Sequence, residues 1–421
     1  MEKFHTHLGI DADGESVGVS LEERLRHTAA FGATGVGKST LFLNLIAQSM
    51  AHGDGLLLLD PHGDLAEDTL GLVPVSRNNQ VCYFNLGDLA HPVALNILED
   101  VSPDDRATHA ENIVSAMRAI WKDSWGDRLE RILRHAITAL IETPGASLVL
   151  LPRLLTDEDF RRRIVPRLSN PITRSFFEKQ FDVWRDQFRD EVIVSTLNRI
   201  EAFSTTPAVR NVIGQSRSTL HFEHALERSR IVIVNLAIGT IGETPAYLMG
   251  SLILARVLAA GMARTKLDRA ARSPFHLYID EAQYMAGNVI RPLITGGRKF
   301  GLSVTLASQG LAELDDRTRA TIRNSVHTLF AFRLGDEDAE TLAPEFDRAH
   351  QTFNPFVLRQ LEIGHAMLRI PGRYGEKVIT APPPELSGRL EVVRKQSRIH
   401  YGVDRSEVED KIIRALKLHH H

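Results

Sequence analysis

Short apolar runs alternate with amphipathic stretches over the first hundred residues. The runs at residues 28–31, 56–60 and 81–85 are continuous, which is typical of strands buried on both faces of a mostly parallel sheet. Between the first two runs, residues 40–50 have helical spacing and are followed by Gly53 and Gly55, which favour a chain reversal. This order of elements predicts an α/β core.

From Ser102 onward the pattern becomes helical. The Ser-Pro-Asp-Asp sequence that begins there is a capped helix start. Helical spacing or start signals predict helices at residues 102–120, at 129–140, from Thr156, from Asn170, at 193–203 and from Thr206. We find no strand pattern between residues 102 and about 220, so an all-helical insertion is expected.

Strand patterns then resume. They lie at residues 231–235, 275–280, 303–309, 328–334, 366–370 and 377–380. With the earlier runs they make roughly nine strands, which suits one large sheet interrupted by helices. We expect an α/β domain in two parts, 1–101 and 223–390, around an all-helical domain at 102–222. Helical spacing continues in a tail at 391–421, whose last residues, His419–His421, resemble a purification-tag remnant.

Composition narrows the class of protein. Hydrophobic residues make up 43% and charged residues 24%, as in an ordinary globular chain, and a net charge of -3 gives no general basic field for nucleic acid. The single cysteine, Cys82, excludes a disulfide framework and fits a reducing cytosol. The apolar stretch 246–263 contains Arg256 and is predicted as a buried core helix. We therefore expect a cytoplasmic chain without a transmembrane segment.

A glycine-rich sequence after the first strand carries the strongest chemical signal. Residues 32–39 fit the pattern G-x-x-x-x-G-K-[ST] between a strand and a helix, the context in which backbone N–H groups cradle phosphates. Lys38 would reach the β- and γ-phosphates of a nucleotide, and the Ser39 hydroxyl would ligate Mg²⁺. The predicted nucleotide-binding residues are Gly32, Ala33, Thr34, Gly35, Val36, Gly37, Lys38, Ser39 and Thr40.

Two carboxylates end a later strand. Asp280 and Glu281 follow the apolar run HLYI, and ligands of open α/β sheets bind at the carboxyl ends of strands. Asp280 suits Mg²⁺, and Glu281 suits a water that attacks the nucleotide. No Asn-Lys-x-Asp sequence is present, which disfavours a GTPase. The pair indicates a nucleotide hydrolase.

Other charged groups leave alternatives open. Asp60 and Asp64 either assist Mg²⁺ or form a turn, because Asp-Pro and Gly-Asp are also turn sequences. His62, His221 and His224 show no Cys or carboxylate at metal-binding spacing. The cluster of Arg161, Arg162, Arg163 and Arg167 either contacts DNA or pairs with the acidic residues 157–159 along a helix.

These motifs, in this order, resemble the FtsK-HerA superfamily of ring-shaped DNA motors. GATGVGKST, LLLLDPHGDL, LYIDEA and GGRKFGLSVTLASQ, with helices between the second and third, are most similar to TraG/TraD-type coupling proteins of conjugation and type IV secretion. The resemblance covers roughly residues 27–382. It implies a RecA-like P-loop fold with an inserted all-α domain, and a homo-oligomer, most often a hexamer, that uses ATP and Mg²⁺ to pump DNA through its channel.

The resemblance also assigns roles to two further residues. Arg298 in GGRKFG corresponds to the arginine finger that each subunit supplies to the neighbouring ATP, with Lys299 beside it as the alternative contact. Gln309, after the strand SVTLAS, corresponds to a polar sensor of the γ-phosphate. An isolated subunit is therefore expected to hydrolyse ATP poorly.

One departure keeps several functions open. Membrane-anchored coupling proteins carry a transmembrane hairpin before the P-loop, and no such pattern precedes Gly32. The chain either derives from an anchored protein or is a soluble relative like HerA-type repair and defence translocases. The expected partners are DNA of either strandedness and relaxosome or secretion-channel proteins, through which the chain would lie at the inner membrane. The alternatives to a DNA motor are a secretion ATPase for protein cargo and a relaxosome-recruiting platform.

Overall fold

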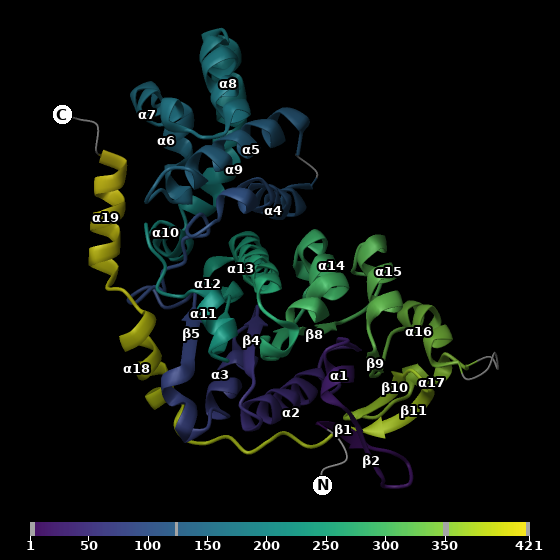
Figure 1. Cartoon of the computed structure of the whole chain (residues 1–421). Coiled ribbons are helices and arrows are strands. Elements are labelled where there is room, and N and C mark those ends of the chain that lie inside the picture. Colours follow the sequence, from purple (N-terminus) through teal and green to yellow (C-terminus); the bar gives the residue numbers. More distant parts are fainter. Residues whose placement is uncertain (1–4, 123–124, 348–352, 418–421) are drawn as a thin grey trace. The chain divides into compact units, whose positions relative to one another are not determined.

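A computed structural model describes residues 5–122, 125–347 and 353–417 (Figure 1). By its internal contacts the chain divides into two units. The first consists of residues 1–83, 222–236 and 257–397, and the second of residues 84–221, 237–256 and 398–421. Each unit therefore combines segments that are far apart in the sequence.

The first unit is organised around a sheet of eleven strands in the order β2-β1-β11-β10-β9-β3-β8-β7-β4-β6-β5. The strands are β1 (Thr6–Ile10), β2 (Ser16–Val19), β3 (Thr28–Phe31), β4 (Gly55–Asp60), β5 (Val81–Asn85), β6 (Ile231–Asn235), β7 (Phe275–Ile279), β8 (Leu302–Ser308), β9 (Thr328–Ala331), β10 (His365–Ile370) and β11 (Arg373–Ile379). From β9 to β6 neighbouring strands are parallel, whereas β10, β11, β1 and β2 pair antiparallel. The predicted α/β class with a mostly parallel sheet is confirmed.

All nine predicted strands form, and two more, β1 and β2, were missed. The continuous runs are buried on both faces: every residue of β3, β4 and β6 is buried. In contrast, β1 and β2 form the antiparallel end of the sheet, and their short sequences THLGI and SVGV mix polar residues and glycine with few large apolar side chains. Edge strands of this kind give a weak sequence signal.

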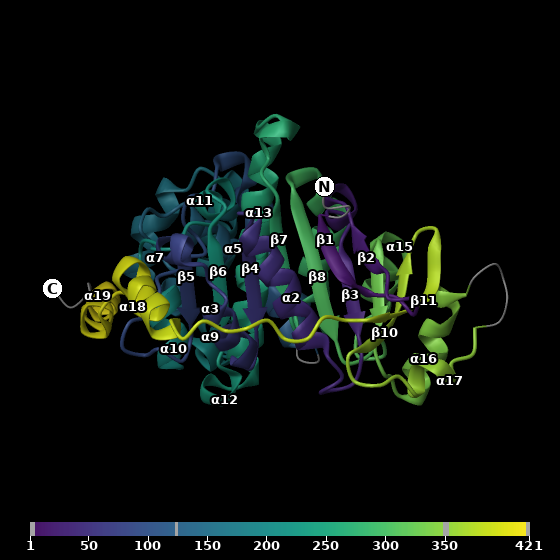
Figure 2. The same ribbon diagram turned by 90° about the horizontal axis from the view of Figure 1, so that it is seen from below.

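Helices cover the sheet of the first unit. They are α1 (Leu21–Arg24), α2 (Lys38–Ala51), α3 (Asp64–Gly71), α11 (Phe222–Glu227), α14 (Gly287–Gly296), α15 (Asp316–Ser325), α16 (Asp336–Leu342) and α17 (Phe356–Arg359), while α18 (Leu390–Tyr401) runs across the unit boundary. One hydrophobic core joins α2 and α3 to the same face of the sheet, through residues such as Phe42, Leu70, Leu56 and Ile231 (Figure 2). This packing holds the start of α2 against the end of β3.

In its described residues the second unit consists of helices and connecting loops, apart from Phe84 and Asn85 at the end of β5. Its helices are α4 (Arg106–Ile120), α5 (Asp127–Ile141), α6 (Leu151–Thr156), α7 (Glu158–Ile164), α8 (Pro171–Lys179), α9 (Asp186–Ser204), α10 (Pro207–Ile213), α12 (Ile238–Ile241) and α19 (Arg405–Lys417). The predicted starts at Asn170 and Thr206 are confirmed, since both are N-cap residues. The start predicted at Thr156 is wrong: α6 ends there, and Asp157 caps α7 by accepting the Phe160 N–H at 2.9 Å.

Helix α13 (Glu243–Ala263) contains the apolar stretch that was predicted as a core helix. Among the described residues, the segment Glu243–Lys266 has the length and hydropathy of a membrane span. However, 78% of its most apolar window is buried inside the protein, and Arg256 is buried with it. Burial of this extent is what a core helix shows. Cys82 is likewise a buried core residue, as expected.

Burial of His27 predicts acid sensitivity of the first unit. Its Nδ1 accepts the Val304 N–H at 3.0 Å, and desolvation lowers its pKa to about 4. A histidine whose folded-state pKa lies below its unfolded value stabilises the fold above pH 6.5, and the contribution is lost as the pH falls towards 4. For these two pKa values it amounts to roughly 3 kcal/mol.

Substituting His27 by Asn should therefore flatten the decline in unfolding free energy between pH 6.5 and pH 4. Denaturant titrations at a series of pH values measure the decline. His62, which is exposed, offers the control substitution to Asn, which should leave the decline unchanged. An unaltered decline in the His27→Asn protein would show that this ring titrates with an ordinary pKa in the folded protein.

Candidate active site

Three adjacent strands bring the sequence-predicted groups together. β8 lies between β3 and β7, with Phe31 opposite Ser308 and Ile279 opposite Leu306. The glycine-rich loop follows β3, Gln309 follows β8, and Asp280 follows β7. Because the three strands are parallel, these groups all emerge at the carboxyl edge of the sheet, where ligands of α/β folds bind.

The glycine-rich loop adopts a conformation that its glycines permit. Gly35 and Gly37 have φ values of 77° and 117°, in the region that side-chain-bearing residues rarely occupy. A Cβ on Gly37 would also come within 3.4 Å of the Gly364 backbone. Gly37 is the N-cap of α2, which starts at Lys38, so the loop and the positive end of an amphipathic helix face one site.

Lys38 lies folded against the loop. Its side chain is only 6% exposed, and Nζ donates to the carbonyl oxygens of Gly32 and Ala33 at 2.6 and 2.9 Å. Burial lowers the pKa of Lys38, while the charges of Glu281 and Asp280 act to raise it. A buried ammonium that is held by two carbonyls and faces a cavity suits an anionic ligand such as a phosphate.

The acidic pair shows the signs of a metal or catalytic site. Burial, and secondly the charges of Glu281 and Asp60, raise the pKa of Asp280 to about 7. Glu281 has φ 47° and ψ 51°, a conformation that costs a non-glycine residue about 1–3 kcal/mol. Gln283 Nε2 donates to Glu281 Oε2 at 2.6 Å, and Gln309 Nε2 lies 3.5 Å from Oε1, longer than an ordinary hydrogen bond. The Glu281 carboxylate is thus oriented by its neighbours.

A cavity of about 210 Å³ lies between the loop and the acidic pair. It is lined by Thr34, Gly35, Gly37, Lys38, Ser39, Thr40, Asp280, Glu281 and Ile363. One lysine therefore faces two carboxylates and the Ser39 hydroxyl across this cavity. This donor set fits a magnesium-bound phosphate, because oxygen ligands suit Mg²⁺ and the cation would restore the ionised form of Asp280.

Arg298 does not lie at this cavity. It follows α14 and precedes β8, so it lies at the amino edge of the sheet. Its Nη2 donates to Glu22 Oε1 at 2.7 Å, and its side chain is 40% exposed. It lines a separate cavity of about 360 Å³ together with Lys299, Arg269 and Arg272. Within one chain, Arg298 and Lys38 therefore lie at opposite edges of the sheet and line different cavities.

Three further residues of the site have no clear sequence signal. Gln283 orients Glu281, and its only sequence signal is its position two residues later. Glu313 lies close enough to Lys38 to act on its pKa. Ile363, which is 68% exposed, lines the cavity because the next residue, Gly364, donates its N–H to Val36 O at 3.0 Å. The sequence around an exposed apolar residue before a strand does not indicate that the residue lies at a distant loop.

The remaining acidic and histidine residues are placed as follows. Asp60 is buried, and its carboxylate accepts the N–H groups of His62 and Ala66 at 2.9 and 2.8 Å, which is the predicted turn role. Asp64 is exposed at the start of α3. Contrary to the sequence-based expectation, His221 does have carboxylate neighbours: its Nδ1 lies 3.7 Å from Asp100 Oδ2, near Glu99.

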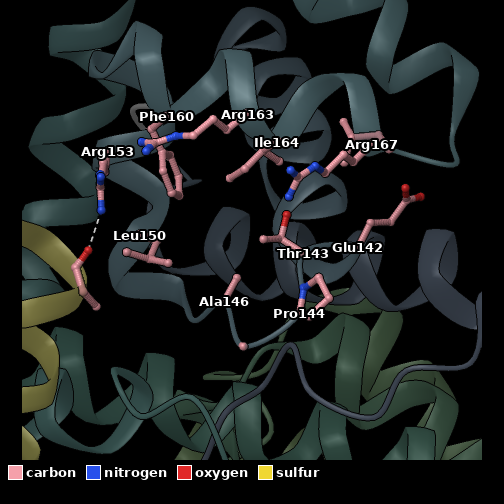
Figure 3. A pocket seen from close by; sticks show the side chains of 13 residues that line it. Glu142, Thr143, Pro144, Ala146, Leu150, Arg153, Phe160, Arg163, Ile164 and Arg167 are labelled. Atoms are coloured by element: carbon pink, nitrogen blue, oxygen red, sulfur yellow. Dashed lines mark hydrogen bonds between the residues drawn. The ribbon is translucent and has the colours of Figure 1, made fainter. Parts of the chain in front are cut away.

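The four arginines of the cluster in the second unit lie in different environments. Arg161 is buried and donates to Asp182 Oδ1 at 2.8 Å and to the Leu154 and Leu155 carbonyls, so it is structural. Arg162 is exposed and pairs with Glu158, one turn earlier on α7. Arg163 and Arg167 line a pocket (Figure 3).

Comparison with known proteins identifies the family. The family model of the central domain of helicase HerA matches residues 7–257. The chain belongs to this family. The fold of this HerA-family chain is similar to that of the bacterial conjugative coupling protein TrwB in complex with ADP and Mg²⁺, with a TM-score of 0.65 and 18% identity over 92% of each chain.

Two further solved structures share the fold. Unbound TrwB lacking its first 70 residues gives a TM-score of 0.64 and 17% identity, covering 92% of this chain and 91% of its own. VirB4 of Thermoanaerobacter pseudethanolicus gives 0.65 and 14% identity, covering 91% of this chain and 98% of its own. Comparison with curated protein sequences gives no match. The predicted RecA-like P-loop fold and the FtsK-HerA resemblance are confirmed.

Proposed function

We propose that this chain is a Mg²⁺-dependent ATPase of the cytoplasm that assembles into a hexameric ring and moves DNA. The observation that carries the proposal is the single cavity lined by Lys38, Ser39, Asp280 and Glu281. TrwB, which shares the fold, has been solved with ADP and Mg²⁺. The proposed domain organisation keeps the α/β domain at 1–101 and 223–390 and the helical domain at 102–222.

The residues of the cavity suit phosphoryl transfer to water. The N–H groups of residues 32–40 and the Lys38 ammonium bind the phosphates, with Lys38 exchanging its carbonyl partners for phosphate oxygens. Ser39 and Asp280 would hold Mg²⁺, which neutralises the charge that develops on the phosphates. Glu281, fixed by Gln283, orients the attacking water and accepts its proton. Gln309 lies beside that carboxylate, from where it would sense the γ-phosphate.

The position of Arg298 supports the proposal of a ring. A second cation at the transferring phosphoryl group raises hydrolysis rates strongly. In the described part of the chain, Lys38 is the only cationic residue that lines the cavity. Arg298 lies at the opposite edge of the sheet, where Arg269, Arg272 and Lys299 line the same cavity. A subunit that presents this edge to the cavity of the next would complete every site in a closed ring, because head-to-tail contacts of one type form a cycle where the rotation between subunits closes.

ATP hydrolysis per subunit is therefore expected to rise with protein concentration and with added DNA. Steady-state rates across a dilution series, with single-stranded and double-stranded DNA in separate arms and the assembly mass measured in parallel, test this expectation. Hydrolysis that tracks the assembled fraction and increases with either DNA supports the motor. A rate per subunit that is indifferent to both dilution and DNA contradicts it.

A further inference from the structure

Two histidines and an aspartate meet at the amino edge of the sheet, away from the nucleotide cavity. His5 directly precedes β1, His52 caps the C-terminus of α2, and Asp54 directly precedes β4. We name these three residues of the first unit the histidine cluster. Because the nucleotide cavity lies at the carboxyl end of β7, which is parallel to β4, the two sites are at opposite edges of the sheet.

The side chains of the histidine cluster converge. One nitrogen of each histidine and one carboxylate oxygen of Asp54 all lie within 4.8 Å of one another. His5 Nε2 is 3.6 Å from Asp54 Oδ2, which is longer than an ordinary hydrogen bond. The separation is instead close to the roughly 3.4 Å between two ligand atoms of a tetrahedral zinc ion, as metal–ligand bonds of about 2.0–2.2 Å require. The His52 ring completes the group, with its centroid 4.3 Å from that of His5.

The surrounding structure holds these three residues in place. Their backbone N–H groups donate, at 3.1, 3.0 and 3.0 Å, to the carbonyl oxygens of Val19, Gln48 and Ser49, respectively. The Asp54 side chain is also held, because the buried His276 donates from Nε2 to Asp54 Oδ2 at 3.1 Å. A ligand carboxylate that accepts a hydrogen bond from a second residue is a regular feature of metal sites in proteins.

The histidine cluster is accessible to a solvated ion. His52 is exposed, and the side chains of His5 and Asp54 are 23% and 13% exposed. Two imidazoles with one carboxylate suit Zn²⁺, whereas Mg²⁺ prefers oxygen ligands. Among the described residues, one other group of this kind exists, formed by Glu99, Asp100 and His221 of the second unit, and it offers one imidazole.

We propose that the histidine cluster binds Zn²⁺ through one nitrogen of His5, one nitrogen of His52 and the carboxylate of Asp54, with water in the fourth position. The ion would join the segment before β1 to the turn between α2 and β4. It would stabilise the first unit, because a ligand that binds the folded state raises the free energy of unfolding. The inference is independent of the proposed ATPase function.

The test measures zinc binding to the full chain by competition with a chromogenic chelator. His419–His421 are replaced by alanine throughout, because their imidazoles would also bind the ion. One equivalent of Zn²⁺ should bind and raise the Tm. In His52→Asn the Kd should rise roughly tenfold or more, since losing a ligand weakens a metal site at least as much as losing an outer partner. The zinc-dependent rise in Tm should disappear with it.

The variants are chosen so that binding and folding are separated. His52 is exposed, so His52→Asn should fold without zinc, which circular dichroism checks. His5→Asn should weaken zinc binding to a similar extent. His221→Asn is the matched control, because it removes a histidine of the other group and should leave the Kd unchanged. Glu281→Gln should bind zinc normally, so a failure of the nucleotide site does not affect this result.

Three results would overturn the proposal. They are zinc binding no tighter than that of the His52→Asn protein, an undiminished affinity in His5→Asn, and an equal loss of affinity in His221→Asn. Each would leave an ion pair between protonated His5 and Asp54 as the role of these contacts.

Discussion

Replacing Glu281 by Gln is expected to lower the rate of ATP hydrolysis about 10²–10⁴-fold, the contribution of a general base. The amide keeps the shape of the side chain and can still accept the hydrogen bond from Gln283, but it cannot take a proton from water. Nucleotide binding should change little, because the loop and Lys38 are untouched. Single-turnover hydrolysis and a separate binding titration distinguish the two effects.

Glu313 provides the matched control for this substitution. It is a third carboxylate near Lys38, after Glu281 and Asp280, and it is exposed on the loop after β8. Burial together with the charge of Glu281 raises its pKa. Glu313→Gln should reduce hydrolysis much less than Glu281→Gln, since Glu313 is outside the cavity lining. A larger loss of hydrolysis in the Glu313 variant, or normal turnover without the Glu281 carboxylate, would show that a group other than Glu281 acts as the general base.

Replacing Arg298 by Ala is expected to reduce hydrolysis about 10³–10⁵-fold in the assembled protein, the range for a guanidinium that stabilises the transferring phosphoryl group. Its ion pair with Glu22 joins exposed groups and contributes little to stability, so the fold should persist. Nucleotide should still bind to each subunit. Lys299→Ala, one residue further along, should retain activity, which separates the two basic residues.

Mixing two inactive variants shows whether Arg298 acts across subunits. The Arg298→Ala subunit has an intact cavity, and a Lys38→Ala subunit has an intact arginine. After exchange of subunits in equal amounts, up to about a quarter of the interfaces in a cyclic assembly should combine both intact groups and regain hydrolysis. Absence of any recovery, with mixed assemblies demonstrated by mass, would place Arg298 in its own subunit's site or outside catalysis.

The parts of this molecule that the sequence predicts are those with a local signal. Continuous apolar runs such as LLLLD mark strands that are buried on both faces, and the glycine-rich loop and the DE pair each follow such a strand. β1 and β2, the last two strands at the antiparallel end of the sheet, have no such run, because each contains polar residues or glycine. Thr156 has the chemistry of an N-cap but ends a helix, since Asp157 makes the capping bond.

What the sequence does not reveal is proximity that tertiary structure creates. Ile363 reaches the cavity through a backbone hydrogen bond between Gly364 and Val36, more than 300 positions apart in the chain. Arg161 and Arg163 lie two positions apart on α7 with the same side chain, yet the first is buried and donates to Asp182, whereas the second is exposed and lines a pocket. The histidine cluster likewise depends on packing that no spacing rule predicts. Such features can be recognised only in the folded structure.

The most direct test of the account is an experimental structure of the Glu281→Gln protein with ATP, Mg²⁺ and DNA. We predict a closed ring in which Lys38 contacts the β- and γ-phosphates, Asp280 lies at the metal, and Arg298 of the adjoining subunit reaches the γ-phosphate. ATP bound away from residues 32–40, or Arg298 still paired with Glu22 and facing solvent in the nucleotide-bound assembly, would contradict it.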